Sequence, residues 1–421
     1  MRSWRMGQMT GSSTGANMIL DEIEEEIAEY IGTRYAVVCS SARSSIRFSL
    51  LSLGIGHGDE VLVPDLVPEE LPITVFCTGA SPRFCDVDRR TCAMSFTRFQ
   101  QSLRSNTKAV IFAQLYGLPA DPSPIKEITE EREIALIEDA SQALGASING
   151  KKAGACGHVG ILNFNKSLNV PLGAAVTTND KELASRIKSN RAKYETKSLF
   201  ASLCYHIMEL SGLKAKEIIQ VVFWGDKYLY KLMHETLAKK HFQEIEGWTK
   251  VNADALEMWG SNSLTATIIN QLIAHCDGRY WHRRKLEKIE IMLLKKEFEN
   301  LGNYLQDRRK SAKMYDEYLK QGGYEKILVP PNSISSYKKY PILFSEKTRL
   351  SKCIKELTRA GFIVDYRYKP LHMSPSFGVM NEDSNFKEAI YILEHLLPLP
   401  ITLSMKPEKI EQAASIVNLN S

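Results

Sequence analysis

Asp139 and Lys166 are the two residues of this chain whose types and order could carry out a reaction together. Asp139 ends an apolar run, residues 134–139, that is typical of a buried strand, and Lys166 follows 27 residues later. A lysine amine can bond to the aldehyde of pyridoxal phosphate (PLP), and a carboxylate can keep the pyridine nitrogen protonated so that the ring accepts electrons. A helix-capping aspartate and a surface lysine would give the same spacing, so the pair alone leaves both interpretations open.

A serine-rich segment, residues 40–45, lies between a predicted strand and a predicted helix. The helix N-terminus, the hydroxyl of Ser41, the backbone of Ala42 and the guanidinium of Arg43 could bind a phosphate group there. A plain serine N-cap would produce the same pattern. The segment lacks the glycines of the loops that bind nucleoside triphosphates and dinucleotides. Those ligands therefore fit it poorly, whereas a single phosphate group does not need these glycines.

One further polar residue belongs to the same candidate site. Gln142 lies one turn past Asp139, where its amide could donate a hydrogen bond to the phenolic oxygen of the cofactor. A glycine-containing strand segment, residues 154–166, delivers Lys166, and glycines allow close backbone approach to a flat cofactor. His158 in that segment has no metal-ligand spacing around it, so we predict a structural role for it and no metal site.

The elements that must position these residues alternate between strands and helices. Apolar runs predict strands at residues 35–39, 60–64, 82–87, 109–113 and 136–138, with helices at 20–31 and from 46 onward. Such alternation predicts an α/β fold with a mostly parallel sheet flanked by helices. After a helical middle from about 195 to 300, a helix at 301–320, a strand at 340–344, a helix at 350–360 and a final strand at 361–364 predict a smaller α+β domain. We therefore divide the chain into a flexible arm at 1–18, a large domain at 19–250 and a small C-terminal domain at 251–421.

Composition limits the classes of function. The chain has 421 residues, 44% hydrophobic and 24% charged, with a net charge of +5, which argues against a nucleic-acid-binding protein. The eight cysteines form no CxxC pair and the first 18 residues have no apolar signal core, so we expect a cytoplasmic protein with reduced thiols. Apolar stripes with interspersed lysines at 199–237 are typical of packing on the protein, although a membrane-surface helix would have the same pattern.

Ordered motifs on both sides of the pair resemble the DegT/StrS family of sugar aminotransferases, which are fold-type I PLP enzymes. Residues 56–64 resemble the family's G-x-G-D-E-V-x-x-P turn and strand, and residues 79–88 resemble its G-A-x-P-x-F-x-D-V-D segment. Residues 137–143 resemble E-D-A-A-Q-A, and residues 368–372 and 396–400 resemble the Y-x-P-L-H and L-P-L-P signatures. The matches run in order from about residue 20 to the C-terminus.

The resemblance implies a role for each residue and a function for the chain. Lys166 would hold PLP covalently and move protons, while Asp139 would pair with the pyridinium. The cofactor contacts would be Gln142 at the ring oxygen, Arg43 with its neighbours Ser41 and Ala42 at the phosphate, Asn163 also at the phosphate, and Asn262 from the partner subunit of a homodimer with shared active sites. Tyr116, Arg367 and His372 are expected to line the substrate entrance. The activity would be transfer of the amino group of glutamate to a nucleotide-linked keto sugar, for amino-sugar, polysaccharide or antibiotic biosynthesis.

Three departures from the family pattern keep alternatives open. Ala42-Arg43 stands where Gly-Thr is usual, the loop before Lys166 is two residues shorter than the common form, and residues 65–69 lack an aromatic that would stack on the pyridine ring. A dehydratase or deoxygenase of the same fold is one alternative, but such relatives carry histidine in place of the lysine. A PLP-fold protein that has lost activity and serves as a sensor or assembly subunit is the other.

Overall fold

The computed structural model describes residues 15–170, 172–193, 285–286, 288–320, 322–364, 368–374, 377, 385–402 and 405–421. Several predictions from the sequence fall outside these residues. They are most of the N-terminal arm, most of the helical middle with the apolar stripes at 199–237, and the two site residues Asn262 and Arg367.

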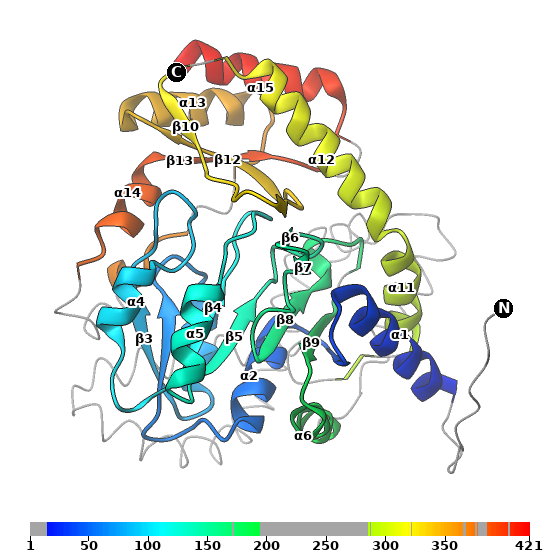
Figure 1. The fold of residues 1–421 in the computed structure, drawn as a ribbon. Helices are drawn as coiled ribbons and strands as arrows, with labels where there is room; N and C mark the ends of the chain where they lie inside the picture. Colours follow the sequence, from blue (N-terminus) through cyan, green and yellow to red (C-terminus); the bar gives the residue numbers. More distant parts are fainter. Residues whose placement is uncertain are drawn as a thin grey trace, which may run out of the picture.

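A seven-stranded sheet forms the centre of the large domain (Figure 1). Its order is β1 (Tyr35–Cys39), β9 (Ala174–Thr178), β8 (Val159–Asn163), β5 (Ala135–Asp139), β4 (Thr107–Ala113), β2 (Glu60–Pro64) and β3 (Ser81–Cys85). Every paired neighbour is parallel except at β9, which runs antiparallel to both β1 and β8. The prediction of a mostly parallel α/β sheet is therefore confirmed.

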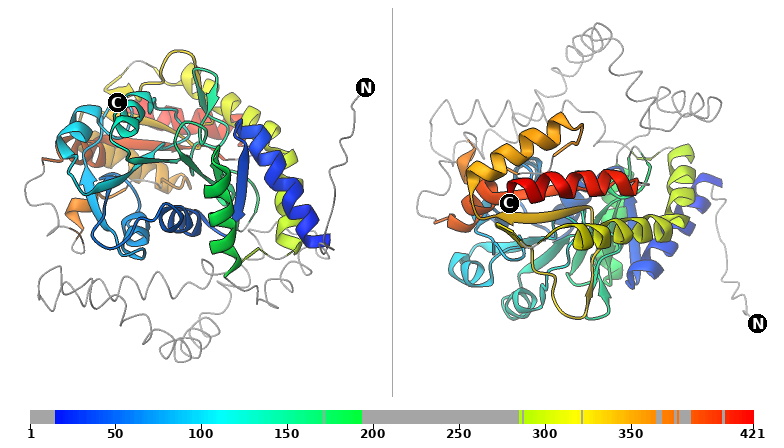
Figure 2. Two further views of the ribbon diagram at one scale, coloured as in Figure 1. Left: turned by 60° about the horizontal axis from the view of Figure 1, so that its bottom comes forward. Right: turned by 90° about the horizontal axis from the view of Figure 1, so that it is seen from above.

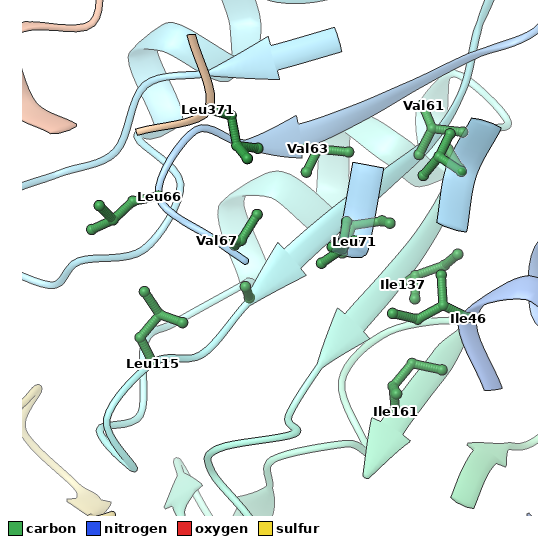
Figure 3. Packing of buried hydrophobic residues seen from close by; sticks show 14 of the residues in the cluster. Ile46, Val61, Val63, Leu66, Val67, Leu71, Leu115, Ile137, Ile161 and Leu371 are labelled. Carbon is green, nitrogen blue, oxygen red and sulfur yellow. The ribbon is translucent and has the colours of Figure 1, made fainter. Parts of the chain in front are cut away.

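Helices cover both faces of this sheet, as a parallel sheet requires. One face packs on α2 (Ala42–Ser52), α3 (Glu70–Phe76) and α6 (Lys181–Ala192); the other packs on α1 (Gly15–Ile31), α4 (Phe96–Ser102), α5 (Ser123–Glu131) and α11 (Lys288–Glu299). Side chains alternate along each strand, so Val61 and Val63 of β2 face the first group while Leu62 faces α4 and α5. Figure 3 shows Ile46 of α2 beside Ile137 and the β8 residue Ile161 in the core of the first face.

The small C-terminal domain is built on an antiparallel sheet of β10 (Tyr324–Lys326), β12 (Lys339–Phe344) and β13 (Leu396–Pro400). Its helices are α12 (Leu301–Tyr318), α13 (Lys347–Arg359), α14 (Lys387–His395) and α15 (Pro407–Asn420). Figure 2 shows α15 between α12 and α13 when the molecule is viewed from above. A third sheet, β11 (Ser333–Ile334), β6 (Ser147–Ile148) and β7 (Lys151–Lys152), joins this half of the chain to the large domain.

The structure corrects some boundaries that apolar periodicity alone gave. Helix α1 begins at Gly15, so residues 15–18 of the predicted arm are helical, and α2 begins at Ala42 because the hydroxyl of Ser41 caps it. Residues 361–364 do not form the predicted strand. Residues 285–305, expected in the small domain, instead contribute side chains to the core around α1 and β8, and the small domain's own core begins at Ala312. In the described part of the chain, no helix is long and apolar enough to cross a bilayer.

Candidate active site

Polar residues gather at the carboxyl ends of the parallel strands. Ser40, Asp65, Asp86 and Gln114 each follow a strand directly, whereas Asp139 and Asn163 are the last residues of theirs. Because β1, β2, β3, β4, β5 and β8 are parallel, these ends lie at one edge of the sheet. This is the edge at which open α/β sheets bind their ligands.

Lys166 reaches this edge on a single turn of 3₁₀ helix, η1 (Phe164–Lys166), which follows β8 without a break. Phe164 is fully buried and makes an edge-to-face contact with Phe298 of α11, with the ring centroids 6.0 Å apart, which fixes the start of the turn. Strand β8 pairs with β5, so the turn that carries Lys166 follows the strand next to the one that ends at Asp139. The predicted pair therefore lies at one site.

Charged neighbours and burial set the state of the Lys166 amine. Burial lowers the pKa of this lysine most, although the residue as a whole keeps some exposure, and the Arg43 guanidinium lowers it further. The carboxylates of Asp139 and Glu70 act in the opposite direction and raise the pKa. The net shift is downward, so a larger fraction of the amine is neutral and nucleophilic near pH 7 than for an exposed lysine. Glu70, at the start of α3, was not among the predicted site residues, and its position in the sequence gave no sign of this proximity.

The phosphate-binding prediction falls on the N-terminus of α2. Ser41 is the N-cap, and its hydroxyl accepts a hydrogen bond from the Ser44 N–H at 3.2 Å. The Ser44 hydroxyl lies 3.1 Å from that of Ser41 and 3.2 Å from that of Ser40, so three hydroxyls meet at the first turn. Ala42 and Arg43 are the first two residues of the helix and are both partly exposed. The turn thus combines helix N–H groups, hydroxyls and a cation, which suits a phosphate.

Gln142 connects the site to two tyrosines. Its side-chain oxygen accepts a hydrogen bond from the Tyr116 N–H at 3.1 Å, and its Nε2 donates to the Tyr368 hydroxyl at 2.7 Å. Tyr368 belongs to the motif at residues 368–372, so this bond joins the large domain to the C-terminal segment. The Tyr116 ring is fully buried, with a backbone φ of 60°. The predicted contacts of Gln142 with the cofactor and of Tyr116 with substrate stay predictions.

His372 is held by a carboxylate that sequence reasoning missed. Asp65 is fully buried (0% exposed), and its two oxygens bind the His372 backbone N–H at 2.9 Å and the ring Nδ1 at 2.6 Å. The ring also stacks on Phe386 with centroids 4.5 Å apart. Since Nδ1 is engaged, Nε2 is the ring atom left to meet a ligand. Asp65 follows β2 directly, as Asp139 ends β5, and this shared position was the signal that could have identified it.

His158 has the structural role that we predicted. Its Nδ1 accepts a hydrogen bond from the Leu136 N–H at 2.9 Å, and burial lowers the pKa of its imidazole. It precedes β8, whereas Lys166 follows the same five-residue strand, so roughly 17 Å of extended chain separates them.

Unsatisfied polar atoms at this edge match the needs of PLP. Asp139 accepts from the Ser141 N–H at 3.0 Å through Oδ1, and within the described residues its Oδ2 accepts no hydrogen bond. The Ser141 hydroxyl and the Asn163 side-chain oxygen are buried without a partner among those residues. Buried polar atoms are costly to leave unpaired, so a polar ligand at this place is favoured. A lysine, a free carboxylate oxygen and a phosphate-binding turn fit the aldehyde, ring nitrogen and phosphate of PLP.

Comparison with known proteins identifies the family. The model of the DegT/DnrJ/EryC1/StrS aminotransferase family matches residues 9–258 and 261–418. The chain belongs to this family. The DegT/StrS resemblance inferred from the motifs is thereby confirmed, and it covers the described site as well as residues outside it.

The chain spans about half the length of the curated relatives that it matches. The chain is 34% identical over 184 residues to the GDP-perosamine synthase of Caulobacter vibrioides, covering 43% of this chain and 49% of that protein. It is 37% identical over 194 residues to a UDP-N-acetyl-3-dehydro-alpha-D-glucosamine 3-aminotransferase of Acidithiobacillus ferrooxidans, covering 42% of this chain and 52% of the relative. The solved structure of DesV from S. venezuelae superimposes with a TM-score of 0.69 over 95% of this chain and 88% of DesV, at 20% identity. This structural likeness supports the fold-type I architecture of the DegT/StrS enzymes.

Proposed function

We propose that this DegT/StrS protein is a PLP-dependent aminotransferase that moves the amino group of glutamate onto a nucleotide-linked keto sugar. One observation carries the proposal: Lys166 lies at the sheet edge within electrostatic reach of both Asp139 and Arg43. A reactive amine, an acceptor for a ring N–H and a cation for a phosphate are the three groups that PLP needs, and they are provided by three separate elements of the fold.

When bound, PLP supplies an electrophilic aldehyde and a ring that accepts the electrons released when a proton leaves the substrate carbon. Lys166 would supply the amine that holds PLP, and in its neutral form it would take up and return that proton. Asp139, whose Oδ2 accepts no hydrogen bond from the described residues, would keep the ring nitrogen protonated. Arg43 and the hydroxyls at the N-terminus of α2 would bind the phosphate, together with Asn163 from the end of β8.

The substrate class is proposed from the relatives. GDP-perosamine synthase and the UDP-N-acetyl-3-dehydro-glucosamine aminotransferase are both named for nucleotide-linked sugars. In this chain, His372 has its Nδ1 fixed by Asp65, which leaves Nε2 available for a sugar hydroxyl. We propose that Tyr116, Arg367 and His372 line the substrate side of the site.

A shared active site in a homodimer is part of the proposal, with Asn262 of each subunit contacting the cofactor phosphate of the other. Subunit mixing tests it, because Lys166→Ala and Asn262→Ala would then damage different sites. Equal amounts of the two inactive variants, allowed to exchange subunits, should regain about a quarter of wild-type activity. No recovery in a mixture shown to contain heterodimers would refute the shared site.

A half-reaction without any sugar tests the activity itself. The purified protein, loaded with PLP, is given glutamate alone, and 2-oxoglutarate and the cofactor absorbance are measured. We expect one equivalent of 2-oxoglutarate per site, and a loss of at least about a thousandfold in rate for Lys166→Ala. Lys151→Ala, on the exposed end of β7, is the matched control and should react like wild type. Absence of 2-oxoglutarate with unchanged absorbance would sink the transaminase proposal and favour a dehydratase or an inactive sensor.

A further inference from the structure

The turn that carries Lys166 has little support of its own. It is three residues long, Phe164–Lys166. The N–H groups of Ser167 and Leu168, which follow it, both donate to the Phe164 carbonyl, at 2.9 and 2.7 Å. A 3₁₀ turn of this length leaves its last carbonyl groups without partners inside the turn. Buried backbone groups need partners, so the position of the Lys166 backbone depends on groups supplied from elsewhere.

Three charged side chains from later in the sequence supply those partners. The Lys338 ammonium donates to the carbonyl of Lys166 itself. Arg308 of α12 donates from Nη2 to the Ser167 carbonyl at 2.8 Å, and Glu297 of α11 accepts from the Asn169 N–H at 3.2 Å. The partners thus match in sign: cations meet carbonyl oxygens and a carboxylate meets an N–H.

All three contacts involve a charged side chain, and those of Arg308 and Glu297 are also shielded from water. Arg308 is 4% exposed and Glu297 is 9% exposed, and Glu297 is itself fixed by the Tyr304 hydroxyl at 2.7 Å. Hydrogen bonds to ionised groups are roughly twice as strong as neutral ones, and a low local dielectric strengthens them further. The turn is therefore fixed on its carbonyl side by charged side chains.

The backbone around Lys338 is held by a different loop of the large domain, at Tyr116 and Gly117. The Ser336 N–H donates to the Gly117 carbonyl at 2.8 Å, and the Lys339 N–H donates to the Tyr116 carbonyl at 3.1 Å. A Cβ added at Gly117 would lie 2.4 Å from the Lys338 nitrogen, so the two backbones are as close as glycine allows. The Lys338 side chain consequently starts from a backbone that cannot shift without breaking this packing.

We propose that Lys338 and Arg308 are positioning residues for Lys166. They hold the carbonyls of residues 166 and 167, so that the amine of Lys166 projects toward Asp139 and Arg43 with one backbone geometry. Both come from the part of the chain after residue 300, so the seating of the small domain on the large one sets the position of the lysine. Their importance for catalysis rests on the proposed function, whereas their effect on the turn does not.

The test compares Lys338→Met with Lys313→Met, a lysine of α12 whose side chain is 80% exposed. Hydrogen–deuterium exchange of residues 164–169 is measured in the full-length, cofactor-free protein. Loss of one charge-assisted bond should speed exchange of the Ser167 and Leu168 amides by about tenfold. Exchange in β5 should stay unchanged, and Lys313→Met should match wild type throughout.

A second readout separates positioning from general support. In the PLP-loaded protein, the pH midpoint of the absorbance from the bond to Lys166 should shift in Lys338→Met and return toward wild type in Lys338→Arg, which restores a cation. The rate constant kcat of the glutamate half-reaction should fall more than KM rises. Arg308→Lys, which keeps the charge but loses the guanidinium geometry, is the second variant and should show the same effects more weakly.

Unchanged exchange at 164–169 together with an unchanged pH midpoint in both Lys338→Met and Arg308→Lys would overturn the proposal. Equal acceleration of exchange across β5 and the turn would also overturn it, since that result means global loosening. If wild type binds PLP without a covalent bond to Lys166, the proposed function fails, but the exchange result in the cofactor-free protein still decides the anchoring.

Discussion

Replacing Gly117 with alanine puts a methyl group into a close backbone contact between the two halves of the chain. The added Cβ would lie 2.4 Å from the Lys338 nitrogen and 2.7 Å from the Tyr337 nitrogen, and real Cβ atoms essentially never come that near. Both atoms are backbone, so no side-chain rotation relieves the overlap. Gly117 also has a φ of +79°, which L-residues rarely adopt.

The expected loss of stability has two sources. The left-handed backbone costs an alanine about 1–2 kcal/mol. Displacing the backbone at 337–338 costs about 1–3 kcal/mol more, as overpacking of close-packed interiors does. The free energy of unfolding should therefore fall by about 2–5 kcal/mol in Gly117→Ala. Gly32→Ala is the matched control, because Gly32 has a φ of +88° but nothing within 4 Å of its added Cβ, so only the backbone cost applies.

Denaturant unfolding, monitored by circular dichroism, gives the free energy of unfolding of both variants. The two are compared only if the slope of this free energy against denaturant concentration is the same. Gly117→Ala should lose about 1–3 kcal/mol more than Gly32→Ala. Hydrogen exchange at residues 164–169 should also rise in Gly117→Ala and not in the control, because the Lys338 ammonium is moved off the Lys166 carbonyl. Equal destabilisation of the two variants would refute the steric reasoning.

Three further changes test the site. Asp139→Asn should cut the glutamate half-reaction at least about a hundredfold, with stability changed by less than about 1 kcal/mol because its oxygen can still accept from Ser141. Lys166→Met should be more stable than cofactor-free wild type at pH 7, because burial lowers the pKa of this lysine and the unfolded chain binds the proton more tightly. Paired melting curves should show this difference in stability shrinking as the pH rises toward about 10. Asp65→Ala should lose about 1–3 kcal/mol in denaturant unfolding because it leaves the His372 ring and N–H without their buried partner, and Asp65→Asn should lose less.

The strands were predictable because their side chains are buried on both faces. Residues 35–39 and 60–64 are strands with the predicted bounds, since uninterrupted apolar runs bounded by polar turns leave little ambiguity. Helix starts were less clear, because a hydroxyl cap such as Ser41 starts α2 four residues before its first large apolar residue, Ile46. Apolar periodicity marks the buried face of a helix and not its capped end.

The candidate site divides in the same way. Asp139, Lys166 and Ser41 could be proposed from the sequence because each follows a local pattern at the end of a strand or the start of a helix. The partners that orient the site are distant in sequence: Asp65 and His372 are 307 positions apart, and Lys338 is 172 positions from Lys166. Only the folded chain brings these groups together, so no local spacing predicts which of them pair.

Chemical trapping tests the central claim most directly. The full-length protein is incubated with PLP, treated with borohydride, digested and mapped by mass spectrometry. Our account predicts a single phosphopyridoxyl group on the peptide that contains Lys166, and none on that peptide in Lys166→Ala. A reduced adduct confined to other lysines, or cofactor that is removed entirely by dialysis after reduction, would contradict it.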